Sequence, residues 1–229
     1  MADWLEKLEK ARLENKKDFT IESIETSYKE LDEALGLGGI PRGKIIEVAG
    51  APGVGKSAII LDIIAKAQEK ELNVLYLDLD RGFNREFASL RYVKCEDLLI
   101  FRPDASNPKN ISLAISEMIK KNLVDIIVFD SISQLGEGIP FILQELSRDI
   151  VGTKVSVILA SQLRHNFDDP RDYKTPYMQV LNQYSNIRMM IKKLESIKHG
   201  EVLIGRKIEI NIYKNEMFYP KTCDIDIYF

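Results

Sequence analysis

The sequence predicts an α/β fold with a mostly parallel central sheet, helices on both of its faces, and antiparallel strands at its C-terminal end. Between residues 44 and 160, short apolar segments alternate with segments of helical periodicity. The apolar segments are continuous runs, which is typical of parallel strands covered on both faces. After residue 187, the remaining strand-like segments are separated only by turns, which favours antiparallel pairing.

Composition limits the class of protein. The chain has 229 residues, of which 45% are hydrophobic and 29% charged, as in a soluble domain with one good core. Its net charge of -3 leaves no basic surface overall, so nucleic acid binding would have to be local. Cys95 and Cys223 form neither a close pair nor a metal-binding spacing, which indicates reduced thiols. With no membrane-spanning run and no signal peptide, we expect a cytoplasmic protein without a membrane partner.

Residues 1–26 are predicted to be an N-terminal helix and linker. Within residues 2–17, an apolar stripe of Trp4, Leu5, Leu8 and Ala11 separates charged faces. This helix either caps its own domain or is an arm that docks on a neighbouring subunit, for which Trp4 would be the anchor. Residues 27–229 are predicted to form the core.

The elements of the core follow from local patterns. A helix at residues 27–35, with Thr26 or Ser27 as its N-cap, leads into a glycine-rich turn that ends at Gly43. Strands are predicted at residues 44–49, 74–78, 98–101, 125–130 and 155–160, and helices at residues 56–70, 84–90, 108–121 and 139–149. A polar segment at residues 165–175 is predicted to be a mobile loop, and three last strands are predicted at residues 187–194, 207–213 and 224–228.

The strongest functional signal is the segment GAPGVGKS, which fits the phosphate-binding pattern G-x-x-x-x-G-K-[ST]. It lies between a predicted strand and a predicted helix, a context that argues against a chance match in a glycine-rich turn. Backbone N–H groups of such a loop bind phosphates, while Lys56 reaches the β- and γ-phosphates and Ser57 holds Mg²⁺. The residues expected to bind ATP here are Gly50, Ala51, Pro52, Gly53, Val54, Gly55, Lys56, Ser57 and Ala58.

Polar residues follow three of the predicted parallel strands. Asp130 ends the strand IIVFD and is expected to hold Mg²⁺ with Ser57, unless it only caps the next turn. Asp78 ends the strand VLYLD and Asp80 follows it, where a carboxylate could polarise the attacking water or cap the next helix. Gln162 follows VSVILAS and either senses the γ-phosphate or is a turn residue.

Two basic features are weaker. Arg188, Lys192 and Lys193 could face DNA, but a solvated strand face is the favoured interpretation. His199 lies in the turn KHGE and is expected to be a solvated loop residue.

The chain resembles the RecA family of strand-exchange recombinases, nearer the bacterial than the archaeal type. The resemblance covers residues 31–135 and continues from residue 155 to the end. It is carried by the segments LDEALGLGGIPRGKIIEVAGAPGVGKS, NVLYLDLD, VDIIVFDSISQL, SQLRHNF and KIEINIYKNEMFYP. It implies a P-loop ATPase core of RecA type at residues 27–229.

The resemblance also implies roles for individual residues. Asp80 stands where the family has its catalytic Glu, so Lys56, Asp80 and Gln162 are the expected catalytic residues. Asn84 and Phe87 match positions that hold the adenine ring. Gln162 matches a γ-phosphate switch that leads into the second DNA-binding loop, whose basic candidates here are Arg164, His165, Arg171 and Lys174.

Other positions concern assembly, and several depart from the family. Lys214 matches a lysine that reaches the ATP of the next subunit, whereas Glu216 replaces a second interface lysine and would repel phosphate. Asp80 is one methylene shorter than Glu, which predicts slow hydrolysis. The segment between residues 133 and 155 is too short for the family's first DNA loop, and the expectation is a paralogue without the bacterial C-terminal domain or the archaeal N-terminal domain.

Three functions are compatible with these residues. The favoured one is an ATP-binding, weakly hydrolysing protein that acts on single-stranded DNA in recombination or repair and self-associates into a filament or ring. The second is a nucleotide-binding regulatory or assembly module with little turnover and no DNA role, which Asp80 and Glu216 favour. The third is a ring-forming helicase or clock-type ATPase, although the segments SNIRMMIKKLE and IEINIYKN favour the recombinase branch.

Overall fold

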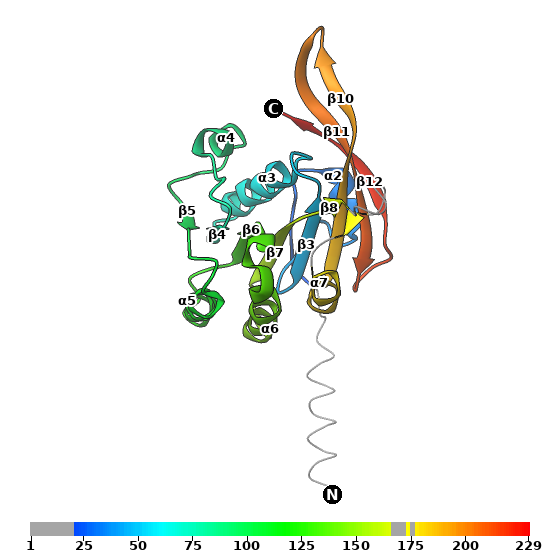
Figure 1. The fold of residues 1–229 in the computed structure, drawn as a ribbon. Coiled ribbons are helices and arrows are strands. Elements are labelled where there is room, and N and C mark those ends of the chain that lie inside the picture. The colour runs from blue at the N-terminus through cyan, green and yellow to red at the C-terminus, as the bar shows by residue number, and fades with distance from the viewer. Residues whose placement is uncertain (1–20, 166–172, 175–176) are drawn as a thin grey trace, which may run out of the picture.

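The computed structural model describes residues 21–165, 173–174 and 177–229. The predicted N-terminal helix at residues 2–17 and Arg171 lie outside these ranges. In the described part of the chain, the central sheet has eight strands in the order β12-β11-β10-β3-β7-β6-β4-β5 (Figure 1). The strands are β3 (Ile45–Gly50), β4 (Val74–Asp78), β5 (Leu98–Phe101), β6 (Ile126–Asp130), β7 (Ser156–Gln162), β10 (Ile187–His199), β11 (Val202–Asn215) and β12 (Thr222–Tyr228).

The sheet has a parallel part and an antiparallel part. Strands β10, β3, β7, β6, β4 and β5 pair in parallel with their neighbours. Strands β10, β11 and β12 pair antiparallel and form the C-terminal end of the sheet. The predicted fold class is therefore confirmed, and β10 is the strand that joins the two parts.

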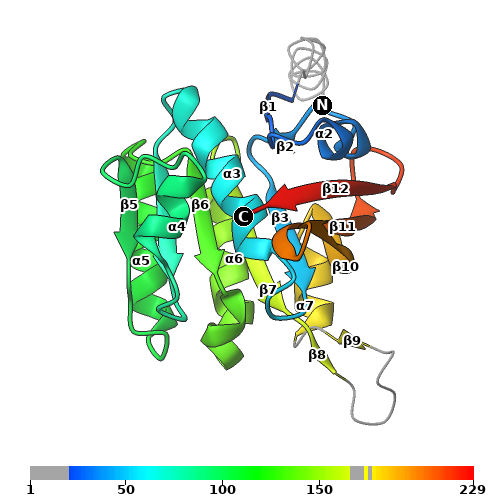
Figure 2. The ribbon, with the colours of Figure 1, turned by 90° about the horizontal axis from the view of Figure 1, so that it is seen from above.

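Helices cover both faces of the sheet (Figures 1 and 2). The buried residues of α2, α3 and α4 belong to one hydrophobic core, and those of α5, α6 and α7 belong to a second core on the other face. The helices are α2 (Lys29–Leu35), α3 (Lys56–Glu69), α4 (Arg85–Leu90), α5 (Pro108–Lys120), α6 (Ile139–Asp149) and α7 (Met178–Tyr184), and a 3₁₀ segment, η1, covers Ile132–Gly138. Of the helices in the described residues, none has the length and apolar character needed to cross a bilayer.

The start of α2 differs from the prediction. Its N-cap is Tyr28, and no side chain caps it. Thr26 instead organises the preceding turn: its Oγ1 accepts from the Tyr28 N–H at 3.3 Å and donates to Asp32 Oδ1 at 2.8 Å. Ser27 takes a positive φ of 73° between them, so neither predicted capping residue occupies the cap position.

Strands β10 and β11 are longer than predicted. β10 pairs with β3 only from Ile187 to Ile191 and then continues with β11 alone to His199. Figure 1 shows this β10–β11 hairpin projecting beyond the rest of the sheet. Its outer residues are mostly exposed on both faces, so they lack the apolar pattern from which a strand is predicted. His199 lies at its tip and is exposed, as expected for a loop residue.

Two small ladders complete the fold. Strand β1 (Ser23–Ile24) pairs with β2 (Ile40–Pro41) next to Gly39, where a Cβ would lie 2.2 Å from the Ile24 carbonyl oxygen. Glycine is required there because its φ of 147° is also unfavourable for other residues. Strand β8 (Arg164–His165) pairs with β9 (Tyr173–Lys174), so the two ends of the predicted loop at residues 165–175 form a short antiparallel ladder.

Candidate nucleotide-binding site

The loop between β3 and α3 is shaped by glycines. Gly50 ends β3 and Lys56 begins α3, while Gly53 and Gly55 take left-handed backbone conformations with φ of 71° and 119°. Gly55 is the N-cap of α3 and supplies no side-chain cap. The first N–H groups of α3 have no intrahelical partner, and together with the positive end of the helix dipole they form a site for an anion.

Lys56 is buried at the base of this loop. Its Nζ donates to the carbonyl oxygens of Gly50 at 2.9 Å and Ala51 at 3.0 Å. Burial lowers the pKa of Lys56, and the nearby carboxylates of Asp130 and Asp80 oppose that shift. A phosphate in the loop can replace the two carbonyls as the partner of this ammonium group.

The pair expected to hold the metal is in place. Ser57 Oγ, in the first turn of α3, donates to Asp130 Oδ2 at 3.0 Å, and Tyr76 on β4 donates to the same oxygen at 2.5 Å. Burial raises the pKa of Tyr76, and Asp130 raises it further, so the phenol remains a donor. Among the described residues, no three His, Cys, Asp or Glu side chains form a metal cluster. These oxygens fit Mg²⁺, which takes few protein ligands and completes its shell with phosphate and water.

Asp78, the last residue of β4, and Asp80, just after it, have different surroundings. Asp78 is buried, and its carboxylate accepts from Arg102 Nε at 2.7 Å and from the Phe83 N–H at 3.2 Å. Asp80 is exposed and accepts only a local bond from the Gly82 N–H at 3.1 Å. Partial burial and the charge of Asp130 raise the pKa of Asp80. Neither acid caps α4, so Asp80 is the one whose carboxylate is available to a ligand.

A cavity of about 310 Å³ continues from the loop. Its lining residues are Gly53, Val54, Gly55, Lys56, Ser57, Ala58, Phe87, Arg206, Ile227 and Phe229. Figure 2 shows the C-terminal end of β12 reaching α3. Of the last three lining residues, Ile227 lies on β12, Phe229 follows β12 directly, and Arg206 lies on the neighbouring strand β11. Phe87 is where an adenine contact is expected, whereas Asn84 is the N-cap of α4 and accepts from the Phe87 N–H at 2.9 Å.

Arg206, Ile227 and Phe229 are site residues that sequence reasoning missed. They belong to no motif, and they reach the cavity only through the antiparallel pairing of β11 with β12. The one available signal was the alternation of Ile225, Ile227 and Phe229, which places them on one face of a strand.

Arg91 links the elements that carry Phe87 and Phe229, the two rings that form the aromatic wall of the cavity. Its Nε donates to Asp62 Oδ1 on α3 at 2.7 Å, and its Nη1 donates to the Tyr228 carbonyl on β12 at 2.9 Å. The guanidinium also lies 5.7 Å from the centroid of the Phe87 ring. One side chain therefore links α3, α4 and β12 around the cavity.

Gln162 lies beside the start of the loop. Its backbone is in register with Gly50, and the next N–H, that of Leu163, donates to the Gly50 carbonyl at 3.2 Å. The Gln162 N–H donates to Ser133 Oγ at 3.1 Å. Because β8 follows directly, Gln162 joins the phosphate loop to the segment that holds the DNA-binding candidates.

Those candidates are only partly placed. The backbone register of β8 and β9 sets Arg164 opposite Lys174 and His165 opposite Tyr173. Arg164 and Lys174 are therefore neighbours at the base of one loop, close to the end of β7.

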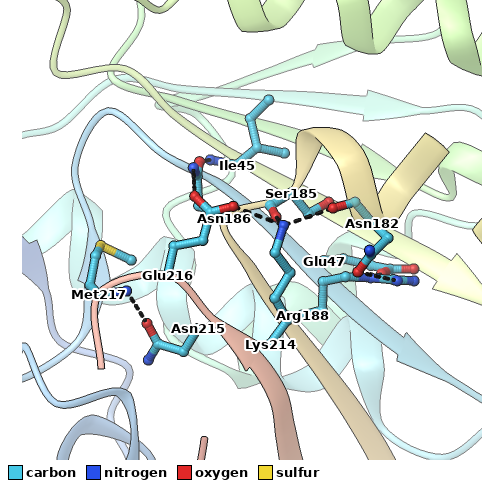
Figure 3. A network of polar contacts seen from close by, with 10 residues as sticks. All are labelled: Ile45, Glu47, Asn182, Ser185, Asn186, Arg188, Lys214, Asn215, Glu216 and Met217. Atoms are coloured by element: carbon cyan, nitrogen blue, oxygen red, sulfur yellow. Dashed lines mark hydrogen bonds and ion pairs between the residues drawn. The ribbon is translucent and has the colours of Figure 1, made fainter. Parts of the chain in front are cut away.

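Lys214 lies on β11, two strands away from β3 and level with Glu47 rather than with the phosphate loop, in the polar network of Figure 3. Its Nζ donates to the carbonyl oxygens of Asn182 at 2.7 Å and Ser185 at 2.6 Å, at the C-terminal end of α7. It also pairs with Glu216 Oε1 at 2.8 Å. Partial burial of Glu216 favours a higher pKa, but the hydrogen bonds from Lys214 and Asn186 outweigh it, so the pKa of Glu216 is lowered.

The three basic residues of β10, Arg188, Lys192 and Lys193, differ in burial. Arg188 is 2% exposed and pairs with fully buried Glu47, so the prediction of a solvated face was wrong for this residue. Lys192 and Lys193 are exposed, and Lys192 Nζ lies 3.8 Å from Glu209 Oε1 on β11.

Known proteins match most of the chain. A family model described as the RecA N-terminal domain matches residues 6–140, more than half of the chain. Protein RecA of Limosilactobacillus reuteri (strain DSM 20016) is 30% identical over 239 residues, covering 94% of this chain and 65% of that protein. Protein RecA of Clostridium acetobutylicum is 29% identical over 231 residues, covering 90% and 65%. Protein RecA of Chloroflexus aggregans is 32% identical over 231 residues, covering 90% and 64%.

The chain spans slightly less than two thirds of the length of these relatives. The family-model match includes the phosphate loop, β4 and β6, and with them Lys56, Ser57 and Asp130. The resemblance identified from the sequence segments is confirmed by both comparisons. The chain therefore belongs to the RecA family.

Proposed function

We propose that this chain binds ATP with Mg²⁺, hydrolyses it slowly, and acts on single-stranded DNA in recombination or repair. The observation that carries the nucleotide part is the composition of the cavity. Its lining includes two cations, Lys56 and Arg206, no carboxylate, and a wall of Phe87, Ile227 and Phe229. A ligand with an anionic end and a flat apolar end fits both parts, and the loop N–H groups favour phosphate as the anion.

Bound Mg²⁺ would supply charge neutralisation on the phosphates. Ser57 and Asp130 would hold the ion, and Lys56 would bind the distal phosphate oxygens. Arg102 pairs with the carboxylate of Asp78, whereas that of Asp80 accepts only from the Gly82 N–H among the described residues, which supports Asp80 as the group that orients the attacking water.

The DNA part of the proposal is supported by family membership and by the position of Gln162 between the phosphate loop and β8. Self-association is supported by Lys214, because it lies too far along the sheet to serve the phosphates of its own loop. Its pairing with Glu216 neutralises part of its charge and should weaken any coupling between nucleotide and assembly.

Lengthening the catalytic acid tests the proposed role of Asp80. Asp80→Glu is expected to raise the hydrolysis rate by about tenfold, because the longer side chain can reach beyond the local bond to Gly82. Asp80→Asn is expected to lower it. Phosphate release at saturating ATP and Mg²⁺ measures both, and an unchanged rate in Asp80→Glu would place the water elsewhere.

Salt dependence tests the DNA proposal. If Arg164, Arg171 and Lys174 contact phosphates, log affinity for single-stranded DNA should fall against log salt with a slope of about -2. Replacing all three with Ala should flatten this slope. Replacing Lys109, Lys120 and Lys121 on α5 is the control with the same charge change and should leave the slope unchanged. Absence of affinity at low salt, or of ATPase stimulation by the DNA, would contradict the proposal.

A further inference from the structure

Arg206 is held in place by strands on both sides. Its backbone is in register with Ser196 on β10 and with Ile227 on β12. The preceding residue, Gly205, allows a close approach, since a Cβ there would lie 2.6 Å from the Ile227 carbonyl oxygen. The backbone that carries Arg206 is therefore one of the fixed parts of the projecting hairpin, at the point where it passes the phosphate loop.

The side chain of Arg206 joins the loop to the aromatic wall. Its Nη1 donates to the Gly53 carbonyl oxygen, and its guanidinium carbon lies 5.1 Å from the centroid of the Phe229 ring. Phe229 is placed by its own backbone, whose N–H donates to the Ile204 carbonyl at 3.0 Å. Arg206 Nε is buried without a hydrogen-bond partner among the described residues. A guanidinium has five N–H donors, so the Gly53 contact leaves most of its capacity unused.

The position of Arg206 in the cavity indicates which part of a ligand it meets. Lys56 and Ser57 lie at the inner end, where the distal phosphates and the metal are expected. Phe87, Ile227 and Phe229 form the other end, where an aromatic base fits. Arg206 touches both the loop and the wall, so it lies where these two ends meet. In a nucleotide, the ribose and the α-phosphate lie at that junction, and the α-phosphate is the anionic group that a guanidinium binds.

We propose that Arg206 binds the α-phosphate of the nucleotide and is a second phosphate-binding cation of the site, supplied by the β10–β11 hairpin. This inference rests on the proposed nucleotide binding and adds a residue to it. A bidentate guanidinium contact combines charge with geometry, so both should contribute to affinity.

The test is a comparison of ligands that differ only in phosphate number. Competition against a fluorescent ADP analogue gives the affinities of ATP, ADP, AMP and adenosine for the wild type, Arg206→Met and Arg206→Lys. Arg206→Met keeps an apolar stem on Phe229 and is expected to weaken ATP, ADP and AMP each by about tenfold to a hundredfold. Adenosine should change by less than about twofold, and Arg206→Lys should be intermediate because it keeps the charge without the fork.

Lys207→Met is the matched control. Lys207 is the next residue of β11, lies outside the cavity, and has its Nζ 3.9 Å from Asp224 Oδ2. The substitution Lys207→Met removes one positive charge, as Arg206→Met does, and should leave the affinities for all four ligands unchanged. Thermal unfolding without nucleotide shows that each variant is folded, and if Arg206→Met is not, Arg206→Lys carries the comparison.

The outcomes separate this inference from the proposed function. If the wild type binds none of the phosphorylated ligands, the proposed function fails and the role of Arg206 fails with it. If the wild type binds and the Arg206 variants bind equally well, only the role of Arg206 is overturned. An equal loss for adenosine would also overturn it, because the contact would then be with the base rather than with phosphate.

Discussion

Replacing Lys56 with Ala is expected to reduce the affinity for ATP and Mg²⁺ by about a hundredfold to a thousandfold and to abolish measurable turnover. The ammonium group is buried where the phosphates are expected, and within the described part of the chain its hydrogen-bond partners are the Gly50 and Ala51 carbonyls. A hydrogen bond to a charged group is worth about 1.5–3 kcal/mol, and this group can form more than one with the distal phosphates. Calorimetric titration measures the affinity, and phosphate release measures the turnover.

The same substitution should not destabilise the protein without nucleotide. Burial already lowers the pKa of Lys56, so removing the ammonium also removes a desolvation cost. The melting temperature of Lys56→Ala should therefore be equal to or above that of the wild type. Lys66→Ala is the control on the same helix, since Lys66 pairs with Glu69 at the surface. Affinity within threefold of wild type in Lys56→Ala would contradict the assignment of the loop as the phosphate site.

The part of the fold built from parallel strands could be predicted because its strands are buried on both faces. Runs such as IIVFD and VLYLD appear in the structure with all five residues buried. Polar residues at the ends of such strands meet at one edge of the sheet, so the motif that contains Ser57 and the strand that ends at Asp130 together predicted this contact.

The C-terminal part was harder to predict because its pairing is not local. Helix α7 has seven residues and only Leu181 fully buried, which is too little for a helical period to be recognised. The hairpin beyond Ile191 is solvated, and the contribution of Arg206 and Phe229 to the site depends on how β11 and β12 pair. Apolar patterns in a sequence indicate which residues are buried, whereas the contacts of Arg206 and Phe229 depend on the register in which β11 and β12 pair.

Arg188 is a single residue whose burial depends on strand register and not on the local sequence pattern. Arg188 shares a predicted strand with Lys192 and Lys193, a pattern that favours a solvated face, but the parallel register of β10 and β3 places it opposite Glu47. Glu47 Oε1 also accepts from Ser161 Oγ at 2.6 Å, and the Arg188 guanidinium lies 5.1 Å from the centroid of the Tyr213 ring. A charge in the middle of a predicted strand can be recognised as buried only when its partner on another strand is known.

Removing one member of this pair is expected to have the largest effect on stability. Glu47 and Arg188 are 0% and 2% exposed, and Arg188 Nη2 has no hydrogen-bond partner among the described residues. Glu47→Gln keeps the shape but leaves the guanidinium charge buried without compensation, which should cost about 3–5 kcal/mol of the free energy of unfolding. Urea denaturation measures this change, and Glu209→Gln, at the exposed pair with Lys192, should cost less than about 1 kcal/mol.

A double variant separates the cost of burial from the attraction within the pair. Glu47→Leu with Arg188→Met replaces both charges with apolar groups of similar size, so no charge is left uncompensated. Such replacements are often neutral or stabilising, and the double variant should therefore be more stable than either single variant. If the effects of Glu47→Leu and Arg188→Met simply add, the charges do not interact across β3 and β10, and the low stability of Glu47→Leu would have to come from the loss of the hydrogen bond that Ser161 donates to Glu47.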